Sequence, residues 1–277
     1  VPCLAMAVKV RKKGEEEKVV AGINRLVEED PTIKFEINSE TREQVLYGLG
    51  EQHLDNIVSK LKTKFGVEVD LSVPKVAYRE AISQRAEFNY THKKQTGGSG
   101  QYARVAGYIE PTVSENPDEP APDYVFVDEV KGGAIPTEYI PSCDKGFQTA
   151  VKKGSQLGFP VIGVKVCVND GAWHPVDSSD MAFQTAALNA FREAYEKAKP
   201  VILEPIMKVE VEGPSEFQGN IFGSINQRRG MIISSTEDNN QCTVIAEVPL
   251  AEMFGYSTVL RSLTQGKAEF TMEVAKY

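Results

Sequence analysis

The most restrictive feature of this sequence is an order of strands and helices that occurs near both ends of the chain. The N-terminal apolar spacing predicts the order βαββαβ, with strands at 4–10, 33–38, 44–48 and 67–73 and helices at 15–29 and 51–65. The same order follows Pro205, with strands at 206–211, 231–236, 242–248 and 268–274 and helices at 217–228 and 250–263. This is the ferredoxin-like, split βαβ plan, in which two helices cover one face of a four-stranded antiparallel sheet.

The middle of the chain follows a different pattern. It predicts strands at 76–88, 101–111, 124–130 and 161–168, a helix at 142–157, a turn at 169–171 and a helix at 178–198. Residues 114–123 are rich in Pro, Glu and Asp and read as a solvated loop. We therefore expect an α+β chain of three domains, at 1–74, 75–199 and 200–277.

Charge and cysteine usage exclude several classes of protein. The net charge of −8 argues against coating of nucleic acid by bulk electrostatics, although an acidic body can still carry a small basic tip. No apolar run approaches the length of a membrane span. The cysteines, at 3, 143, 167 and 242, are far apart and form no C-x-x-C pair, so we expect neither a disulfide framework nor a zinc site, and a cytoplasmic location.

The first candidate site is the segment 92–102, HKKQTGGSGQY. No acidic residue occurs between Asn89 and Ile109, and three glycines within four positions let another backbone approach closely. Lys93, Lys94 and Arg104 can pair with phosphates, while the plainer interpretation is a flexible hairpin end. The motif G-x-x-x-x-G-K-[ST] is absent from the chain, which excludes nucleotide hydrolysis through such a phosphate-binding loop.

The second candidate site is the segment 169–180, NDGAWHPVDSSD, which contains the only Trp of the chain. Asp177 or Ser178 is predicted to cap the helix that follows, and a capped turn would by itself explain the polar cluster. A Trp173–His174 pair on a turn stiffened by Pro175 is also suited to stacking against RNA. A Ser-His-Asp hydrolase is disfavoured, because the chain has no G-x-S-x-G elbow.

The remaining histidines point to structure rather than chemistry. His53, at the start of the predicted helix 51–65, is interpreted as a capping or packing residue, and His92 as a surface residue of a strand. Glu51, His53 and Asp55 do not form a metal-ligand set, because His53 has no metal-ligating partner at i+4 on its helical face.

Long motifs give the chain a resemblance to a known family. They are GLGEQHLD at 48–55, VAYRE at 76–80, HKKQTGGSGQYARV at 92–105, DGAWHPVDSSDMAF at 170–183, GNIFGSINQRRGMI at 219–232 and PLAEMFGYSTVLRSLTQGKAEFTM at 249–272. In this order they resemble elongation factor G, of the translational GTPases, over essentially the whole chain. Trp173, where Tyr is common, and Gln52, where Leu is common, are departures that suggest a divergent member or a paralogue.

The resemblance implies a C-terminal fragment of a ribosomal translocase, a protein that promotes GTP-dependent movement of tRNA and mRNA during translation elongation. A chain that opens without Met agrees with that expectation. The fragment would comprise domain III at 1–74, domain IV at 75–199 and domain V at 200–277. Domains III and V would be ferredoxin-like, and domain IV an arm like ribosomal protein S5. GTP and Mg²⁺ would bind in the missing N-terminal domain, with no catalytic residue, cofactor or metal in the fragment.

The resemblance also implies the site and the partners. The arm tip would enter the decoding site and contact RNA through His174, Trp173, Gly97, Gly98, Ser99, Gly100, Gln101, Lys93 and Lys94. The partners would be the ribosome, at its decoding region and factor-binding-site RNA, and the tRNA–mRNA complex. We expect a monomer in the cytoplasm without membrane contact.

Three alternatives remain. A ribosome-recycling paralogue shares the same domain plan. A tetracycline-resistance-type ribosome-protection protein is disfavoured by the run 173–177, because those proteins replace the histidine-containing tip. A free-standing RNA-binding adaptor is the rival from another class.

Overall fold

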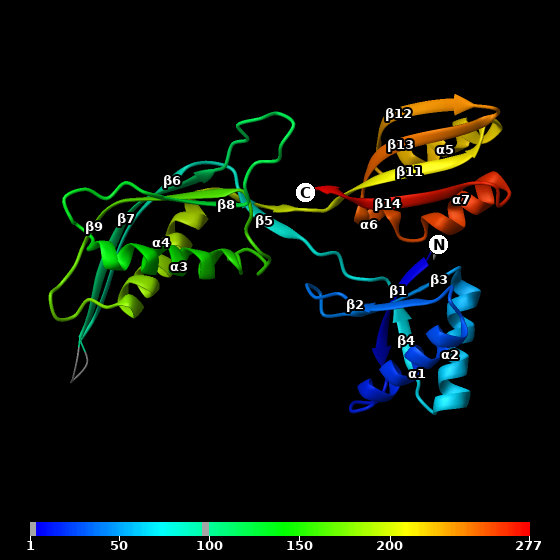
Figure 1. Ribbon diagram of the computed structural model, residues 1–277, viewed down its shortest axis with the longest axis horizontal. Helices are drawn as coiled ribbons and strands as arrows, with labels where there is room; N and C mark the ends of the chain where they lie inside the picture. The colour runs from blue at the N-terminus through cyan, green and yellow to red at the C-terminus, as the bar shows by residue number, and fades with distance from the viewer. Residues whose placement is uncertain (1–3, 96–99) are drawn as a thin grey trace. The chain divides into compact units, whose positions relative to one another are not determined.

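The fold is described from a computed structural model, which covers residues 4–95 and 100–277 (Figure 1). It divides into two compact units. One consists of residues 78–203, and the other combines the two ends of the chain, up to residue 77 and from residue 204. Each unit has its own sheets and its own hydrophobic clusters.

The N-terminal sheet has the strand order β2-β3-β1-β4 and is antiparallel throughout. Its elements are β1 (Leu4–Val10), α1 (Glu16–Glu29), β2 (Lys34–Ile37), β3 (Gln44–Gly48), α2 (Glu51–Phe65) and β4 (Val69–Ser72). The apolar faces of α1 and α2 bury Val19, Ile23, Leu54 and Leu61 against the sheet. The strand order confirms the predicted ferredoxin-like plan.

His53, predicted to be a capping or packing residue, joins the start of α2 to neighbouring groups through hydrogen bonds. Its Nδ1 atom accepts a hydrogen bond from the backbone N–H of Leu49 at 3.0 Å, and its Nε2 atom lies 2.9 Å from Oδ2 of Asp30. The pKa of Asp30 is lowered to about 2, first by the hydroxyl of Thr32 and then by His53. This histidine is therefore fully engaged within the fold.

The C-terminal sheet repeats the plan with the order β12-β13-β11-β14, again antiparallel. Its elements are β11 (Ile206–Pro214), a 3₁₀ turn (Ser215–Phe217), α5 (Gln218–Asn226), β12 (Met231–Asp238), β13 (Gln241–Pro249), α6 (Leu250–Met253), α7 (Tyr256–Thr264) and β14 (Glu269–Lys276). Asn239 and Asn240 turn β12 into β13 with φ angles of 53° and 64°, the left-handed geometry that a two-residue hairpin needs.

The predicted continuous helix at 250–263 is wrong, because it is broken between α6 and α7. Gly255 has a φ of 80°, and a left-handed residue cannot continue a right-handed helix. The break lets two short helical segments follow the sheet, and Met253, Tyr256 and Leu260 are buried in the core of this domain.

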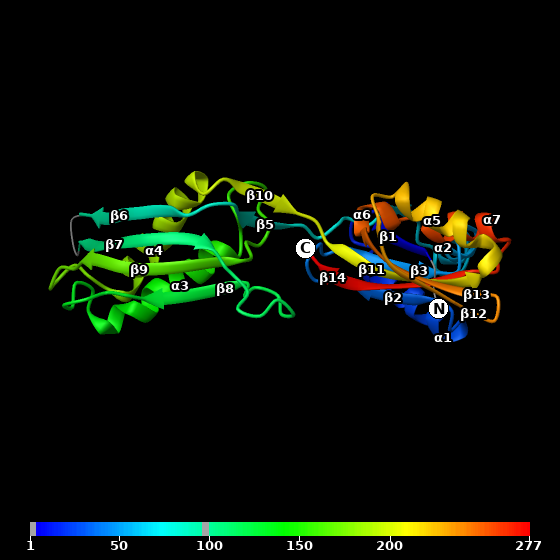
Figure 2. The ribbon, with the colours of Figure 1, turned by 90° about the horizontal axis from the view of Figure 1, so that it is seen from above.

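The middle unit is a four-stranded sheet, order β6-β7-β9-β8, whose strands lie side by side in Figure 2. Its elements are β6 (Ala86–Lys94), β7 (Gln101–Pro111), β8 (Tyr124–Asp128), a 3₁₀ turn (Thr137–Tyr139), α3 (Ile140–Val151), β9 (Val164–Ala172) and α4 (Asp180–Lys197). The pair β8–β9 is parallel and the other pairs are antiparallel. We call this unit the arm. A separate ribbon pairs β5 (Arg79–Ile82) with β10 (Pro200–Leu203).

Three sequence predictions fail within the arm, each for a local reason. The predicted turn at 169–171 is part of β9, because a register shift opposite Ala106 and Gly107 leaves Asn169 as an extra residue and bulges the strand. The predicted helix at 142–157 ends at Val151. The predicted strand at 76–88 is two strands, β5 and β6, which belong to different sheets.

The arm depends on the carboxylate of Glu80, which is fully buried. The hydroxyl of Tyr195 in α4 donates to Oε1 at 2.5 Å, and the backbone N–H groups of Gln156, Leu157 and Phe159 donate at 2.9–3.1 Å. Gly154 lies so close that a Cβ atom there would collide with Oε1, so a glycine permits the close approach of this backbone to the carboxylate. Burial by itself would raise the pKa of Glu80, but these four donors hold it below its ordinary value.

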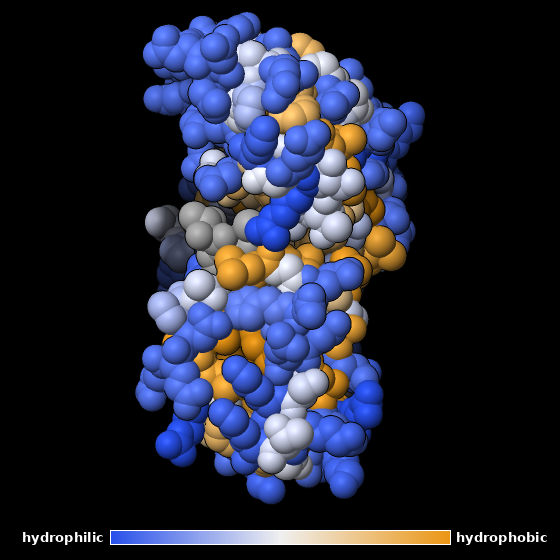
Figure 3. Space-filling model, turned by 90° about the vertical axis from the view of Figure 1, so that its right-hand side faces the viewer, coloured by the Kyte–Doolittle hydropathy of each residue, from blue (hydrophilic) through white to orange (hydrophobic). Residues whose placement is uncertain are grey.

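Hydrophilic side chains dominate the surface shown in Figure 3, with hydrophobic ones in scattered patches. Within residues 4–95 and 100–277, no helix combines the length and the apolar character needed to cross a membrane. Cys167 and Cys242 are buried in β9 and β13, as their positions in apolar strands predict.

We predict that Glu80→Gln lowers the stability of the arm by about 1–3 kcal/mol, because a neutral amide weakens charge-assisted bonds and brings an NH₂ group against backbone donors. Native-state hydrogen exchange of β6 and β7 amides measures this locally. Glu87→Gln, on the exposed side of β6, is the matched control and should change little. Equal protection in the two variants would contradict the role of Glu80.

The stability difference between the wild type and Glu80→Gln should depend on pH. The folded-state pKa of Glu80 lies below its ordinary value of 4.5, so its charge contributes stability above that value. The contribution is lost as the pH falls through the folded-state pKa. We therefore expect the largest difference at neutral pH and a shrinking one in acid.

Candidate nucleic-acid interface

The predicted site residues come from two segments at one end of the arm, which we call the tip segments. The first is the segment 92–102, where β6 leads into β7. The second is the segment 173–179, between β9 and α4. Gly97, Gly98 and Ser99 lie outside the described residues. The remaining six, Lys93, Lys94, Gly100, Gln101, Trp173 and His174, are described, and the contacts below bring the two segments together.

The first tip segment is a regular antiparallel pair up to its last described residues. Lys93 is paired with Tyr102 and Lys94 with Gln101, and both lysine side chains are exposed. His92 lies at hydrogen-bond distance from Gln101, with 2.8 Å between Nε2 and Oε1. The two ammonium groups thus stand at the end of a rigid strand, where they can neutralise phosphate charge.

The second tip segment is a single tight turn closed by the ring of His174. The backbone N–H groups of Val176 and Asp177 donate to Nδ1 of His174 at 3.1 and 3.0 Å, and the N–H of Ser178 donates to the carbonyl of His174 at 3.2 Å. The side chain of His174 is 50% exposed and that of Trp173 is 47% exposed. Both rings are therefore presented to solvent from an ordered turn.

Hydrogen bonds between the two segments fix them to each other. The N–H of Tyr102 donates to the carbonyl of Asp177 at 2.9 Å, and the hydroxyl of Ser178 donates to the carbonyl of Tyr102 at 2.7 Å. A Cβ atom at Gly100 would lie 3.0 Å from the carboxyl group of Asp177, so a glycine permits this close approach. The two segments form one surface.

The helix cap was predicted one or two residues too early. Ser179 is the N-cap of α4, and its side chain accepts the N–H of Ala182 at 3.1 Å. Ser178 cannot serve as the cap, because its hydroxyl accepts the N–H of His174 at 2.8 Å and donates to Tyr102. Sequence spacing alone does not reveal which of two adjacent serines takes which role.

Arg104 is not available as a phosphate partner, although its position beside the glycine-rich segment suggests one. Its guanidinium donates to the side chain of Asn89 at 3.0 Å, to the carbonyl of Gly171 at 3.3 Å and to Asp170 at 3.3 Å. It therefore joins β6, β7 and β9 just below the tip. The basic character of the tip rests on Lys93 and Lys94.

The chemistry of this surface is that of binding. Two aromatic rings can stack on bases or hydrogen bond to them, and two ammonium groups can contact phosphates. Nothing among the described side chains provides a nucleophile with a base at hydrogen-bond distance at the tip. In the described part of the chain, no cluster of His, Cys, Asp and Glu could hold a metal ion.

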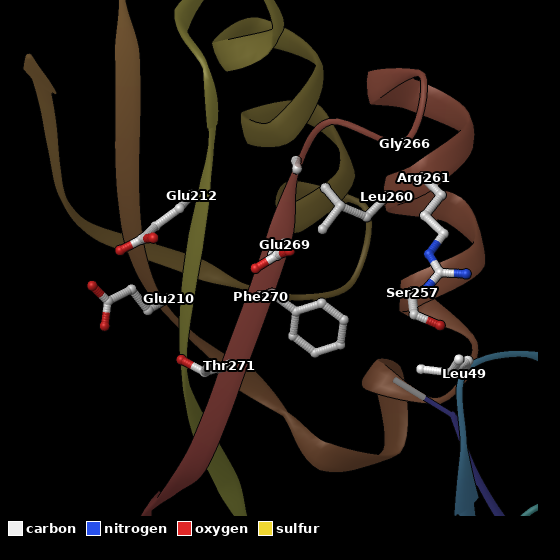
Figure 4. A pocket seen from close by; sticks show the side chains of 11 residues that line it. Leu49, Glu210, Glu212, Ser257, Leu260, Arg261, Gly266, Glu269, Phe270 and Thr271 are labelled. Carbon is white, nitrogen blue, oxygen red and sulfur yellow. The ribbon is translucent and has the colours of Figure 1, made fainter. Parts of the chain in front are cut away.

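A pocket of the C-terminal domain provides no alternative active site (Figure 4). The carboxylates of Glu210 and Glu212 lie on the side of the sheet opposite Phe270 and Leu260, so the pocket wraps around the edge strand β14 rather than gathering groups at one point. Its lining residues include none of the tip residues.

Three family models match the chain in succession. Elongation factor G domain III matches residues 1–73, elongation factor G domain IV matches residues 74–199, and the elongation factor G C-terminus matches residues 201–277. Together they account for nearly every residue of the chain.

Individual proteins give the same picture. The chain is 58% identical to elongation factor G 1 of Treponema pallidum, 55% identical to elongation factor G 1 of Borreliella burgdorferi and 51% identical to elongation factor G 2 of Anaeromyxobacter dehalogenans. Each match covers 100% of this chain and 39% of the relative, so the chain spans about two fifths of these proteins. A crystal structure of a Thermus thermophilus protein matches with a TM-score of 0.87 and 40% identity, over 99% of this chain and 40% of the other.

We predict that the basic residues near the tip differ in their contribution to the stability of the arm. Arg104→Ala should lower the stability of the arm by about 1–2 kcal/mol, because it removes three hydrogen bonds between strands. Lys93→Ala and Lys94→Ala should leave stability within about 0.5 kcal/mol of the wild type, because both side chains are exposed. Hydrogen exchange of β7 and β9 amides measures the difference, and loss of protection in either lysine variant would contradict the assignment.

Proposed function

This chain belongs to the elongation factor G family, and we propose that it forms the C-terminal part of a ribosomal translocase. In the whole protein, the arm would enter the decoding site while tRNA and mRNA move during translation elongation. The proposal is supported by the unbroken order of the three matching domains and by the identity with elongation factor G proteins along the full chain.

The whole protein supplies what this chain does not carry. We propose that GTP and Mg²⁺ bind in a GTPase domain N-terminal to these residues, in a cytoplasmic protein that acts as a monomer. The partners would be the ribosome, at its decoding region and factor-binding-site RNA, and the tRNA–mRNA complex. Within the chain, domain III would comprise residues 1–74, domain IV residues 75–199 and domain V residues 200–277.

The observation that carries the proposed role of the tip is the joined pair of tip segments. Lys93 and Lys94 end one strand, Trp173 and His174 stand on the neighbouring turn, and hydrogen bonds hold the two together. A protein of net charge −8 that gathers exposed cations and aromatic rings at one end is suited to approach RNA there. The proposed contact residues include the Gly97–Gly100 run and Gln101.

We predict that His174→Ala in the full-length protein slows tRNA movement about ten- to a hundredfold, the effect of losing about 1–3 kcal/mol of RNA contact. Ribosome-stimulated GTP turnover and folding should stay nearly unchanged, because the side chain is half exposed and lies in no core cluster. Single-round translocation kinetics and thermal unfolding measure the two effects.

The control for this experiment is Val113→Ala. Val113 is 80% exposed in the same domain but lies in the loop between β7 and β8, outside the tip segments. It should translocate at the wild-type rate. A large loss of stability in His174→Ala with normal translocation would mean that the histidine is structural. Strong subunit splitting with little translocation in the wild type would favour a ribosome-recycling paralogue.

We also predict that the chain by itself neither binds nor hydrolyses GTP, because its sequence contains no G-x-x-x-x-G-K-[ST] loop to cradle the phosphates. Calorimetric titration of the 277-residue chain with GTP and Mg²⁺ should give no heat of binding. Micromolar affinity would contradict the division of labour between this chain and the preceding domain.

A further inference from the structure

The ring of His174 is constrained in a way that selects its chemical form. Backbone N–H groups can only donate, so the two that point at Nδ1, from Val176 and Asp177, require that this nitrogen carry a lone pair. The carboxylate of Asp177, with Oδ2 3.6 Å from Nδ1, lies beyond hydrogen-bond distance, so in the neutral ring the proton must reside on Nε2. In the described part of the chain, no other group lies at hydrogen-bond distance from Nε2.

The turn that holds these N–H groups in place is itself fastened through one hydroxyl. Ser178 Oγ accepts the N–H of His174 at 2.8 Å and donates to the carbonyl of Tyr102 at 2.7 Å. It is thus the side chain that joins the two ends of the turn to each other and to the first tip segment. Both hydrogen-bond partners of the Ser178 hydroxyl are backbone groups, so these two bonds fix the path of the backbone.

We propose that Ser178 is the positioning residue of the tip: it joins the two tip segments and thereby holds His174 as the Nε2–H tautomer. His174 then offers a single N–H donor to whatever the tip meets. The group that it meets must be a hydrogen-bond acceptor, such as a phosphate oxygen, a ribose oxygen or an acceptor on a base edge of RNA. The identity of that ligand rests on the proposed function, whereas the tautomer and the role of Ser178 do not.

The neighbouring serine makes the inference specific. Ser179 is also next to the turn, but its hydroxyl accepts the N–H of Ala182 and caps α4. Removing the hydroxyl at 179 should weaken the start of the helix, and removing it at 178 should loosen the turn. The two variants delete the same atom one residue apart and are matched in size and chemistry.

The first test uses the chain without the ribosome. ¹⁵N chemical shifts of the imidazole rings are recorded at about pH 8.5, well above the ordinary imidazole pKa of about 6.5, so that each ring is neutral. We expect a single Nε2–H tautomer for His174 in the wild type and in Ser179→Ala. In Ser178→Ala, the shifts should move toward the average of a free histidine, and Ser178→Thr should restore the wild-type values.

His53 serves as an internal reference in the same spectra. Its Nδ1 atom also accepts a backbone N–H, from Leu49, and it lies in another domain. Its signals should be the same in all variants, which shows that the N-terminal domain is unaffected, while the amide signals of β7 and β9 report whether the arm stays folded. An unchanged His174 tautomer in Ser178→Ala, or Nδ1–H as the dominant form in the wild type, would overturn the inference.

The second test measures single-round translocation by the full-length protein. Ser178→Ala should slow tRNA movement about tenfold, Ser178→Thr should restore it, and Ser179→Ala should have a smaller effect. In Ser178→Ala combined with His174→Ala, the loss should be less than the product of the single losses, because both act through one ring. Independent, multiplying effects would overturn the positioning role. A normal tautomer response with no effect on translocation would leave the geometry standing and count against the proposed function.

Discussion

The carboxylate of Glu80 accepts four hydrogen bonds from parts of the arm that are far apart in the sequence. It stands on β5, in the ribbon through which the chain enters and leaves the arm, and it joins that ribbon to α4 and to the residues that follow α3. A buried charge is tolerated only when its lone pairs are satisfied, so each donor must be in place at once. This requirement fixes the base of the arm, and the tip is built on the strands and helix that extend from it.

The tip repeats the principle with neutral groups. Backbone donors and acceptors from two loops satisfy one another, and a serine hydroxyl completes the set. Such an arrangement costs little entropy when a ligand arrives, because the turn is already ordered before contact. The ordered turn presents the rings of Trp173 and His174 to solvent, and a tip that contacts RNA, as proposed, would benefit from this order.

Much of the fold could be predicted from the sequence because the apolar periodicity is strong. β1, β3, β7 and α2 begin and end at the predicted residues, and both outer domains have the predicted ferredoxin-like strand order. Two of the failures occur where a single residue departs from the regular pattern. Gly255 interrupts a helix by its left-handed backbone, and Asn169 bulges a strand instead of ending it. Periodicity describes the average course of a segment, and these residues are exceptions to it.

By itself, the sequence determined the α+β class, the ferredoxin-like plan of both ends and the lack of a G-x-x-x-x-G-K-[ST] motif, since each depends on local spacing or on a contiguous motif. Tertiary structure alone decided that Arg104 ties strands together, that Ser179 caps α4, that Ser178 holds the turn, and which nitrogen of His174 faces outward. These roles depend on which backbone groups lie within hydrogen-bond distance. Tyr102 and Ser178 are far apart along the chain. Only the pairing of β7 with β9 brings the hydroxyl oxygen of Ser178 to 2.7 Å from the carbonyl oxygen of Tyr102.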